Sequence, residues 1–253
     1  MNWFLRGIQA GIRTEDYPAS GTDAPLGATP GLPVTTALSN SRDAAELGGR
    51  CPTEAIAADG EIALVNRDRC VHCMRCAAGG GKTKMEWRSD FDWAHGATEG
   101  EAIEQLSAIF GRSLHVRIVD AGDCGACLNE IAHLNDPLYN AHRLGFFVTP
   151  TPRHADVLIV TGPVTRQMKA ALQTAYEAMP DPKRVIAAGV CAVNGGIFGP
   201  SLMCGGGALD AVPVDVVVPG CPPPPLAILH ALLVVCGRKP PARNQAISRG
   251  GAS

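Results

Sequence analysis

Cysteine is the residue type that offers this chain of 253 residues the most chemistry, and its ten cysteines fall into groups. One group begins at "CP" (Cys51) and ends in the run "CVHCMRC", which contains Cys70, Cys73 and Cys76. Thiolates bind soft metals, and closely spaced cysteines are typical of metal sites. Disulfide bonds are the alternative, but a chain that is neither short nor visibly secreted disfavours them.

A second group begins with the C-x-x-C pair in "AGDCGAC", Cys124 and Cys127, and adds two single cysteines, Cys191 and Cys221. The surrounding pattern predicts the elements that must hold these residues. Short apolar strands alternate with amphipathic or apolar helices, which favours an α/β fold with a parallel sheet covered on both faces. The expected strands are 114–119, 155–162, 184–189 and 215–220, and the expected helices lie in 127–145 (about three turns), 163–179 (with a proline near its first turn) and 222–236.

Each cysteine of the second group follows the end of a predicted strand. Cys124 and Cys127 follow the first strand, Cys191 follows the third and Cys221 follows the fourth. Sites in open parallel sheets form beyond the carboxyl ends of the strands, so we expect four thiols to converge on one edge. The loops contain glycines, which leave room for close backbone approach and for amide hydrogens that face a negative group. Four thiolates suit zinc or an iron–sulfur cluster, and spacing alone leaves both open.

The motifs "DCGACLNEI", "TPTPRHADVLIVTGPVT", "GVCAVNGGIFG" and "VPGCPPPP" together resemble a known family. It is the small electron-transfer subunit of energy-converting, membrane-bound NiFe hydrogenases of the formate hydrogenlyase type, homologous to the B (20 kDa) subunit of complex I. The resemblance covers about 115–236 and implies a flavodoxin-like fold. It also implies one 4Fe-4S cluster, proximal to the active site of the large partner subunit, on Cys124, Cys127, Cys191 and Cys221.

One detail of the second group favours hydrogenase chemistry over quinone reduction. The complex I subunit usually begins this motif with two adjacent cysteines, whereas this chain has the C-x-x-C of the hydrogenase-type members. A complex I-like subunit that passes electrons to a quinone or another acceptor stays the alternative, because the nickel ligands would lie on another chain.

The first group resembles part of a two-cluster ferredoxin. There the run C-x-x-C-x-x-C-x-x-x-C-P occurs twice, and the fourth cysteine of each run ligates the other cluster. By this resemblance Cys51 is the fourth cysteine of one run, and Cys70, Cys73 and Cys76 are the first three of the next, which is the full ligand set of one 4Fe-4S cluster. A zinc knuckle is the alternative. The intervening "AIAADGEIALVNRDRC" predicts two strands joined by a turn at Asp59-Gly60.

The N-terminal residues "MNWFLRGIQAGIRTEDYP" resemble the start of the polyferredoxin subunit of the same hydrogenase complexes. Residues 1–16 predict a short amphipathic helix that packs on a neighbouring protein or on a membrane surface. The aromatic residues Trp87, Phe91 and Trp93 are expected to pack. The predicted organisation is an N-terminal helix and extended arm (1–50), a ferredoxin-like 4Fe-4S segment (51–83), a connector (84–112), a flavodoxin-like 4Fe-4S domain (113–237) and a flexible tail (238–253).

Bulk composition excludes some classes of function. A net charge of −2 gives no electrostatic reason for nucleic-acid binding, and no apolar run approaches the roughly 20 residues that span a bilayer. The first residues lack a secretory signal. We therefore expect a cytoplasmic chain, peripheral on the membrane through partner subunits.

The sequence as a whole predicts an electron-transfer subunit with two 4Fe-4S clusters and no acid–base active site of its own. Its expected partners are a NiFe hydrogenase-type large subunit and further iron–sulfur and membrane subunits. A non-redox zinc scaffold and a sensory hydrogenase-like complex are the remaining alternatives. Five residues keep open roles: Glu130 (proton relay or paired carboxylate), Arg153 and His154 (facing a cluster or capping their own loop), and Cys204 and Cys236 (structural thiols by default).

Overall fold

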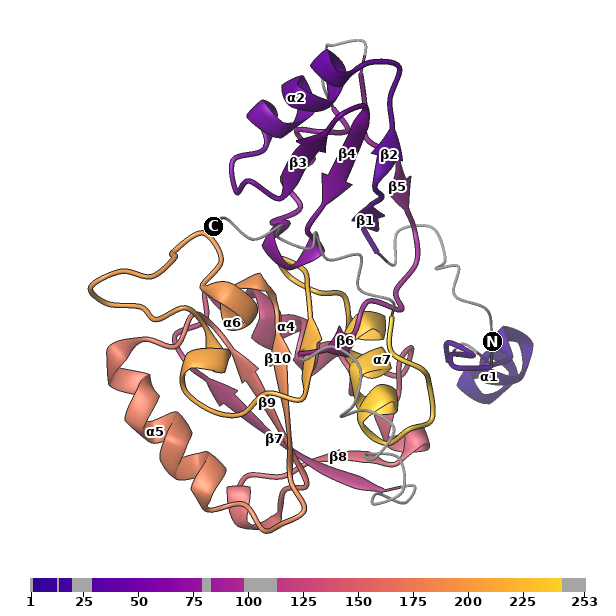
Figure 1. Cartoon of the computed structure of the whole chain (residues 1–253). Coiled ribbons are helices and arrows are strands. Elements are labelled where there is room, and N and C mark those ends of the chain that lie inside the picture. Colours follow the sequence, from indigo (N-terminus) through magenta and orange to yellow (C-terminus); the bar gives the residue numbers. More distant parts are fainter. Residues whose placement is uncertain (1, 13, 20–28, 79–82, 98–112, 243–253) are drawn as a thin grey trace.

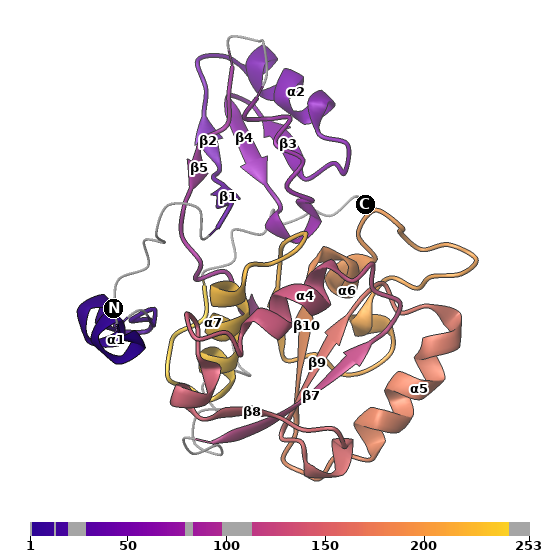
Figure 2. The same cartoon turned by 180° about the vertical axis from the view of Figure 1, so that it is seen from behind.

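The computed structural model describes residues 2–12, 14–19, 29–78, 83–97 and 113–242. A small lobe, residues 32–88, stands beside a larger sheet body made of residues 113–242 and the strand 95–96 (Figure 1). The view from behind shows the same arrangement, with the N-terminal helix set apart from both (Figure 2).

The sheet body is built on a six-stranded sheet. In order across the sheet, its strands are β6 (His95–Gly96), β11 (Val216–Val218), β10 (Arg184–Ala188), β9 (Val157–Thr161), β7 (Leu114–Asp120) and β8 (Phe146–Val148). All neighbours are parallel except β6, which runs antiparallel to β11. The five parallel strands, numbered along the chain, lie in the order 2-1-3-4-5, which is the flavodoxin-like order. The predicted fold class is therefore confirmed.

Helices cover both faces of this sheet. Alternate residues of β9 face opposite sides, and all five are buried because each side meets a helical layer. One face packs against α4 (Ala126–His133) and α7 (Pro225–Val235), and the other packs against α5 (Arg166–Glu177) and α6 (Val190–Asn194). The parallel strands are thereby held at fixed spacing, which fixes where their carboxyl ends lie.

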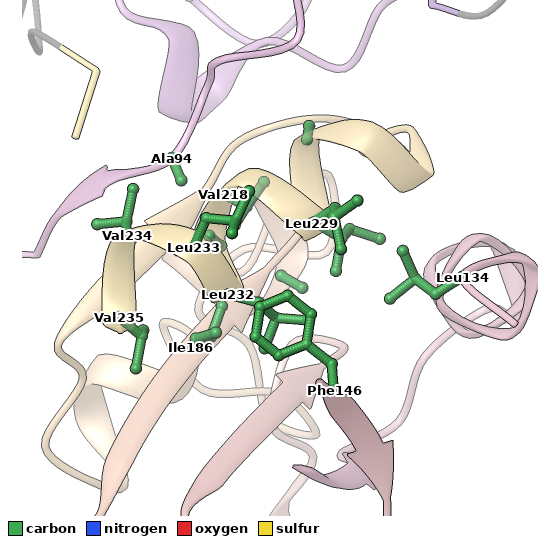
Figure 3. Packing of buried hydrophobic residues seen from close by; sticks show 14 of the residues in the cluster. Ala94, Leu134, Phe146, Ile186, Val218, Leu229, Leu232, Leu233, Val234 and Val235 are labelled. Carbon is green, nitrogen blue, oxygen red and sulfur yellow. The ribbon is translucent and has the colours of Figure 1, made fainter. Parts of the chain in front are cut away.

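Helix α7 is buried along its whole length. Leu229 and Leu232 pack towards the sheet, in one cluster with Ile186 and Val218 (Figure 3). Tyr17, Phe91, Trp93 and Ala94 belong to the same cluster. A helix that is apolar all round is stable in water only when it is covered in this way.

The small lobe contains a three-stranded antiparallel sheet with the order β2 (Thr36–Ala37), β4 (Ile62–Val65), β3 (Ile56–Asp59). Asp59 pairs with Ile62, so Gly60 (φ +57°) and Glu61 form the turn, one residue later than the predicted Asp59-Gly60. The two predicted strands of the hairpin are confirmed. A two-stranded sheet of β1 (Leu32–Pro33) and β5 (Trp87–Arg88) and the helix α2 (Ser41–Arg50) complete the lobe. Its hydrophobic core is small and consists of Leu47, Ile56, Ala63, Val65, Cys76 and Met85.

Helix α2 shows that the expectation of an extended arm up to residue 50 is wrong. Asn40 caps the helix, because its side-chain oxygen accepts a hydrogen bond of 2.9 Å from the backbone N–H of Asp43. Ala44 and Leu47, three residues apart, give the helix a buried face. The Pro, Gly, Ser and Thr content of the preceding residues masked this short amphipathic signal.

Other helices differ from the prediction in length. Helix α4 has eight residues rather than three turns, and the chain turns away before Pro137, which disfavours helix in the residue preceding it. A 3₁₀ turn, η2 (Ala141–Leu144), and β8 follow it. Helix α1 (Trp3–Ala10) ends at Gly11 (φ +65°) and has no buried residue. Helix α5 begins three residues after Pro163, so the proline lies near its first turn, as predicted.

The first residues of the expected tail are held against the sheet body. Arg238 donates a hydrogen bond of 2.6 Å to the carbonyl of Leu144, and Lys239 lies 3.2 Å from Asp92. The remainder of the expected tail, 243–253, lies outside the described residues. Among the helices that the structure describes, none combines the length and the apolar character needed to cross a bilayer.

Candidate metal centres

The second group of cysteines lies at the carboxyl edge of the parallel sheet. Cys124 and Cys127 follow β7, with Cys127 in the first turn of α4, while Cys191 lies at the start of α6 directly after β10. Cys221 follows β11. The sheet therefore brings these four residues to one edge, as the strand-end pattern predicted.

The thiols of this group influence one another electrostatically. Burial raises the pKa of Cys127 well above its usual value, and the negative charges of Asp123, Cys191, Cys221 and Cys124 add to the rise. Burial also raises the pKa of Cys191 to about 11, again with the charges of Cys221 and Cys124, while the backbone N–H of Ile197 opposes it. A bound cation would hold these thiols as thiolates at neutral pH.

Two glycines make room for the sulfurs of this group. A Cβ placed on Gly189 (φ +89°) would lie 2.6 Å from the sulfur of Cys127. A Cβ on Gly196 (φ +57°) would lie 2.7 Å from the sulfur of Cys191. Any larger residue would displace a thiol, so the loops fit a group held close to the backbone.

The first group of cysteines converges in the small lobe. Cys51 directly follows α2, and Cys70 follows a 3₁₀ turn, η1 (Arg67–Arg69), after which the loop to Cys76 carries Cys73. All four line one pocket, together with Trp87. The structure thus brings together the four residues that the ferredoxin resemblance selected.

Backbone amides face the sulfurs of the first group. The N–H of Ala55 donates to the sulfur of Cys51 over 3.2 Å. Burial raises the pKa of Cys70 to about 12, and the backbone N–H of His72 opposes this rise, while the charges of Cys76, Cys51 and Cys73 add to it. Amide donors around sulfur are suited to thiolates that ligate a cluster, because they stabilise negative charge on the ligands.

Trp87, which lines this pocket, and His72, in the loop between Cys70 and Cys73, contain buried polar side-chain atoms without partners among the described residues. Neither ring nitrogen of His72 makes a hydrogen bond there, and the indole nitrogen of Trp87 makes none either. Burial lowers the pKa of His72 to about 4, so its ring is neutral. The orphaned polar atoms and the four thiols fit a group with sulfur acceptors.

The described residues contain no cluster of three or more His, Cys, Asp or Glu side chains that closes around a point for one metal ion. The site at each group is therefore defined by neighbouring thiols and the donors that face them.

The two groups are connected by a direct contact between the small lobe and the sheet body. Asn194, the last residue of α6, donates a hydrogen bond of 2.7 Å to the backbone carbonyl of Asp68 in η1. The side chain of Asp68 lies 2.9 Å from the Nε2 of His95, whose side chain is 7% exposed. Because η1 leads into Cys70 and Cys191 lies in the first turn of α6, this contact joins the two segments that carry the two groups of cysteines.

Sequence reasoning missed Asp68, His95 and Asn194. Asp68 stands two residues before Cys70, and Asn194 stands three residues after Cys191, so proximity to a ligand in the chain was the available signal. His95 lay in a stretch with no clear periodicity, and only the pairing of β6 with β11 brings it to this place.

The residues with open roles now have positions. Burial raises the pKa of Glu130 on α4, and the charge of His133 opposes the rise. Arg153 and His154 are exposed in η3 (Pro152–His154), which precedes β9, so they lie at the amino edge of the sheet and not beside the second group. Thr151 accepts a hydrogen bond from the N–H of Arg153, in agreement with the interpretation as a loop capped by its own polar groups.

The two remaining cysteines stand apart from both groups. Cys236, at the end of α7, is buried and donates a hydrogen bond to the carbonyl of Leu233 over 3.5 Å. Cys204 is half-buried, and its backbone pairs with that of Thr165 in an isolated antiparallel β-bridge.

A sheet of flavodoxin-like order with cysteines beyond the ends of its strands defines a class of α/β domain, and comparison with known proteins gives the family. Residues 124–235 match the model of the family described as "NADH ubiquinone oxidoreductase, 20 Kd subunit". The matched segment begins at the first cysteine of the second group and ends with α7. The chain belongs to this family.

Three relatives illustrate its range. The chain is 46% identical over 132 residues to a probable membrane-bound hydrogenase subunit (mbhJ) of Pyrococcus furiosus, which covers 52% of this chain and 79% of the relative. It is 45% identical over 126 residues to formate hydrogenlyase subunit 7 of Escherichia coli, and the match covers 50% of this chain and 49% of the relative. It is 44% identical over 108 residues to the B subunit of the NADH-quinone oxidoreductase of Carboxydothermus hydrogenoformans, and the match covers 42% of this chain and 65% of the relative. All three relatives are named as subunits of oxidoreductases.

Proposed function

We propose that this chain is the electron-transfer subunit of a membrane-associated NiFe hydrogenase complex and relays electrons through two 4Fe-4S clusters. One cluster would be held by Cys51, Cys70, Cys73 and Cys76, and the other by Cys124, Cys127, Cys191 and Cys221. The observation that carries the proposal is the contact between η1 and α6, which joins the two groups through the hydrogen bond from Asn194 to Asp68.

When bound, each cluster supplies one-electron chemistry. The residues of this chain would hold each cluster and adjust its reduction potential. Backbone N–H groups of Ala55 and His72 face the first group and stabilise charge on its thiolates. The N–H of Ile197 does the same for Cys191, whereas the carboxylate of Asp123 opposes further negative charge near Cys127. The chain supplies no acid–base pair for a substrate in this proposal.

The C-x-x-C spacing of Cys124 and Cys127 supports a hydrogenase-type partner, as do the names of two relatives. The alternative is a complex I-like subunit that passes electrons to a quinone or another acceptor, supported by the third relative. In either case electrons pass between the small lobe and the edge of the sheet.

The proposal includes the organisation around this relay. We infer that the ferredoxin-like segment 51–83 and the flavodoxin-like domain 113–237 are separate cluster-bearing units joined in one chain, with 84–112 as their connector. The chain would lie at the cytoplasmic side of the membrane through partner subunits, with a NiFe hydrogenase-type large subunit next to the second cluster.

Purification of the native complex tests the partner. We expect a large subunit that co-purifies with this chain and contains nickel, measured by mass spectrometry and metal analysis of the same fraction. A large subunit without nickel would reject the hydrogenase proposal in favour of the complex I-like alternative.

A further inference from the structure

Unsatisfied buried donors gather at the first group of cysteines. Native structures leave few buried polar atoms without a partner, and each exception calls for an explanation. In the described part of the chain, three of the five such side-chain atoms belong to His72, in the loop between Cys70 and Cys73, and to Trp87, which lines the pocket of the four thiols. The complete set is His72 Nδ1, His72 Nε2, Trp87 Nε1, Thr161 Oγ1 and Arg184 Nε.

The backbone fixes Trp87 at this pocket. Trp87 lies in β5 and pairs with Pro33 of β1, and its indole packs on the core of the small lobe together with Cys51 and Cys76. The backbone N–H of Met85 donates to the carbonyl of Cys76 over 3.0 Å, which ties the strand to the cysteine loop. The indole is thereby held where it lines the pocket of the four thiols.

Cys76 is the cysteine of this group whose side chain belongs to the hydrophobic cluster on which Trp87 packs, and both residues line the pocket of the four thiols. The indole nitrogen of Trp87 is buried in these surroundings. Among the described residues, the same nitrogen has no partner of full hydrogen-bonding geometry, so its position suits an acceptor that gains negative charge.

Trp93 provides an internal comparison. Its indole N–H donates to the backbone carbonyl and to the side chain of Asp90, at 2.9 and 3.0 Å, and its side chain is buried in the core of the sheet body. Trp93 therefore packs, as its sequence context predicted. Trp87 shares the chemistry of Trp93 but leaves its donor unused beside sulfur.

We propose that the indole N–H of Trp87 donates a hydrogen bond to the Cys76 thiolate of the first cluster and raises the reduction potential of that cluster. The proposal rests on the proposed function, because it requires a cluster on Cys51, Cys70, Cys73 and Cys76. Reduction adds negative charge to the cluster and its ligands, so a donor at a ligand sulfur stabilises the reduced form more than the oxidised form. Trp87 is thus a positioning residue that makes the first cluster a better electron acceptor.

The substitution Trp87→Phe in the full chain within its native complex tests the proposal, because phenylalanine keeps an aromatic ring and lacks the donor. We expect a redox titration followed by EPR to show the first cluster shifted to a more negative potential, with the second cluster unchanged. The expected change is about tenfold in the ratio of reduced to oxidised first cluster at a fixed potential, which is about 59 mV for a one-electron couple. An unchanged potential of the first cluster would overturn the proposal.

A measurement on the unsubstituted chain guards against a variant that does not assemble. With ¹⁵N in the indole rings, pulsed EPR of the reduced first cluster should show a coupled ¹⁵N and an exchangeable proton. Absence of both couplings from an intact first-cluster signal overturns the role of Trp87 and leaves the two-cluster function standing. Absence of the first-cluster signal itself, with only one cluster in the chain, overturns the proposed function instead.

Discussion

The two groups of cysteines are held by very different amounts of structure. The second group rests on a six-stranded sheet with a hydrophobic layer on each face, and three strand ends position its residues. The first group rests on a hairpin, one helix and a core of six buried residues. The sheet body has a large core of its own, whereas the core of the small lobe is small, so we expect the proposed first cluster to supply part of the stability of the small lobe.

Removal of the metal should show this difference most strongly. After chelation under reducing conditions, we expect amide protection from hydrogen exchange to be lost across 32–88 and retained in the strands of the sheet body. The reason is that metal binding is also folding free energy where no sufficient core exists. Equal protection of the small lobe before and after chelation would show that its core is self-sufficient.

A matched pair of substitutions sharpens the same comparison. Leu47 in α2 and Leu172 in α5 are both fully buried, and Leu→Ala at a buried site costs about 2–5 kcal/mol. We expect Leu47→Ala to unfold the small lobe and abolish cluster binding there, because the loss is large relative to its core. Leu172→Ala should lower the thermal midpoint of the sheet body and leave it folded. Thermal unfolding with hydrogen exchange separates the two outcomes, and a folded small lobe in Leu47→Ala contradicts the expectation.

Weakening the contact between α6 and η1, which joins the two regions, should have a smaller effect than the changes above. Asn194→Ala removes the hydrogen bond to the carbonyl of Asp68, worth about 0.5–1.5 kcal/mol, together with the bond of 3.0 Å that its Oδ1 accepts from the N–H of Gly196, and leaves all eight cysteines in place. We expect slower electron transfer between the clusters at unchanged potentials, measured by rapid-freeze EPR after partial reduction. Asn129→Ala, on the exposed side of α4, is the control. Equal rates in Asn194→Ala and the control would show that this contact is not part of the route.

The smallest predicted effect is a pH dependence of the same contact. Burial lowers the pKa of His95, but the hydrogen bond and charge of Asp68 outweigh it, helped by the carbonyl of Gly96 and opposed by the charge of Arg67, so the pKa lies above its usual value. Because the pKa of His95 is raised in the folded state, its protonation stabilises the folded protein below about pH 6.5. This stabilisation is lost as the pH rises through the folded-state pKa of His95.

We therefore expect the small lobe to bind the sheet body less firmly as pH increases above about 6.5. Hydrogen exchange of residues 66–70 as a function of pH measures this. The substitution His95→Gln keeps a hydrogen-bonding side chain without titration and should flatten the profile. A profile that stays the same in His95→Gln would assign the dependence to another group.

The sequence was informative where a pattern repeats and weak where a contact is long-range. Alternating apolar strands and helices predicted the parallel sheet, and strand ends predicted where Cys124, Cys191 and Cys221 would gather. The short helix α2 was missed because its signal is a single cap at Asn40 and two buried residues. The bridge from Asp68 to His95 and the orientation of Trp87 depend on packing between segments far apart in the chain, which no local pattern encodes.

The central claim, two clusters on two sets of four cysteines, depends most on Cys51. The most direct measurement is EPR of the reduced Cys51→Ala chain beside the unsubstituted chain, with iron and acid-labile sulfide determined on both. We predict about eight irons and eight sulfides in the unsubstituted chain, and in Cys51→Ala the loss or conversion of one cluster signal while the other survives. Two unaltered signals in Cys51→Ala, or zinc as the dominant metal, would contradict it.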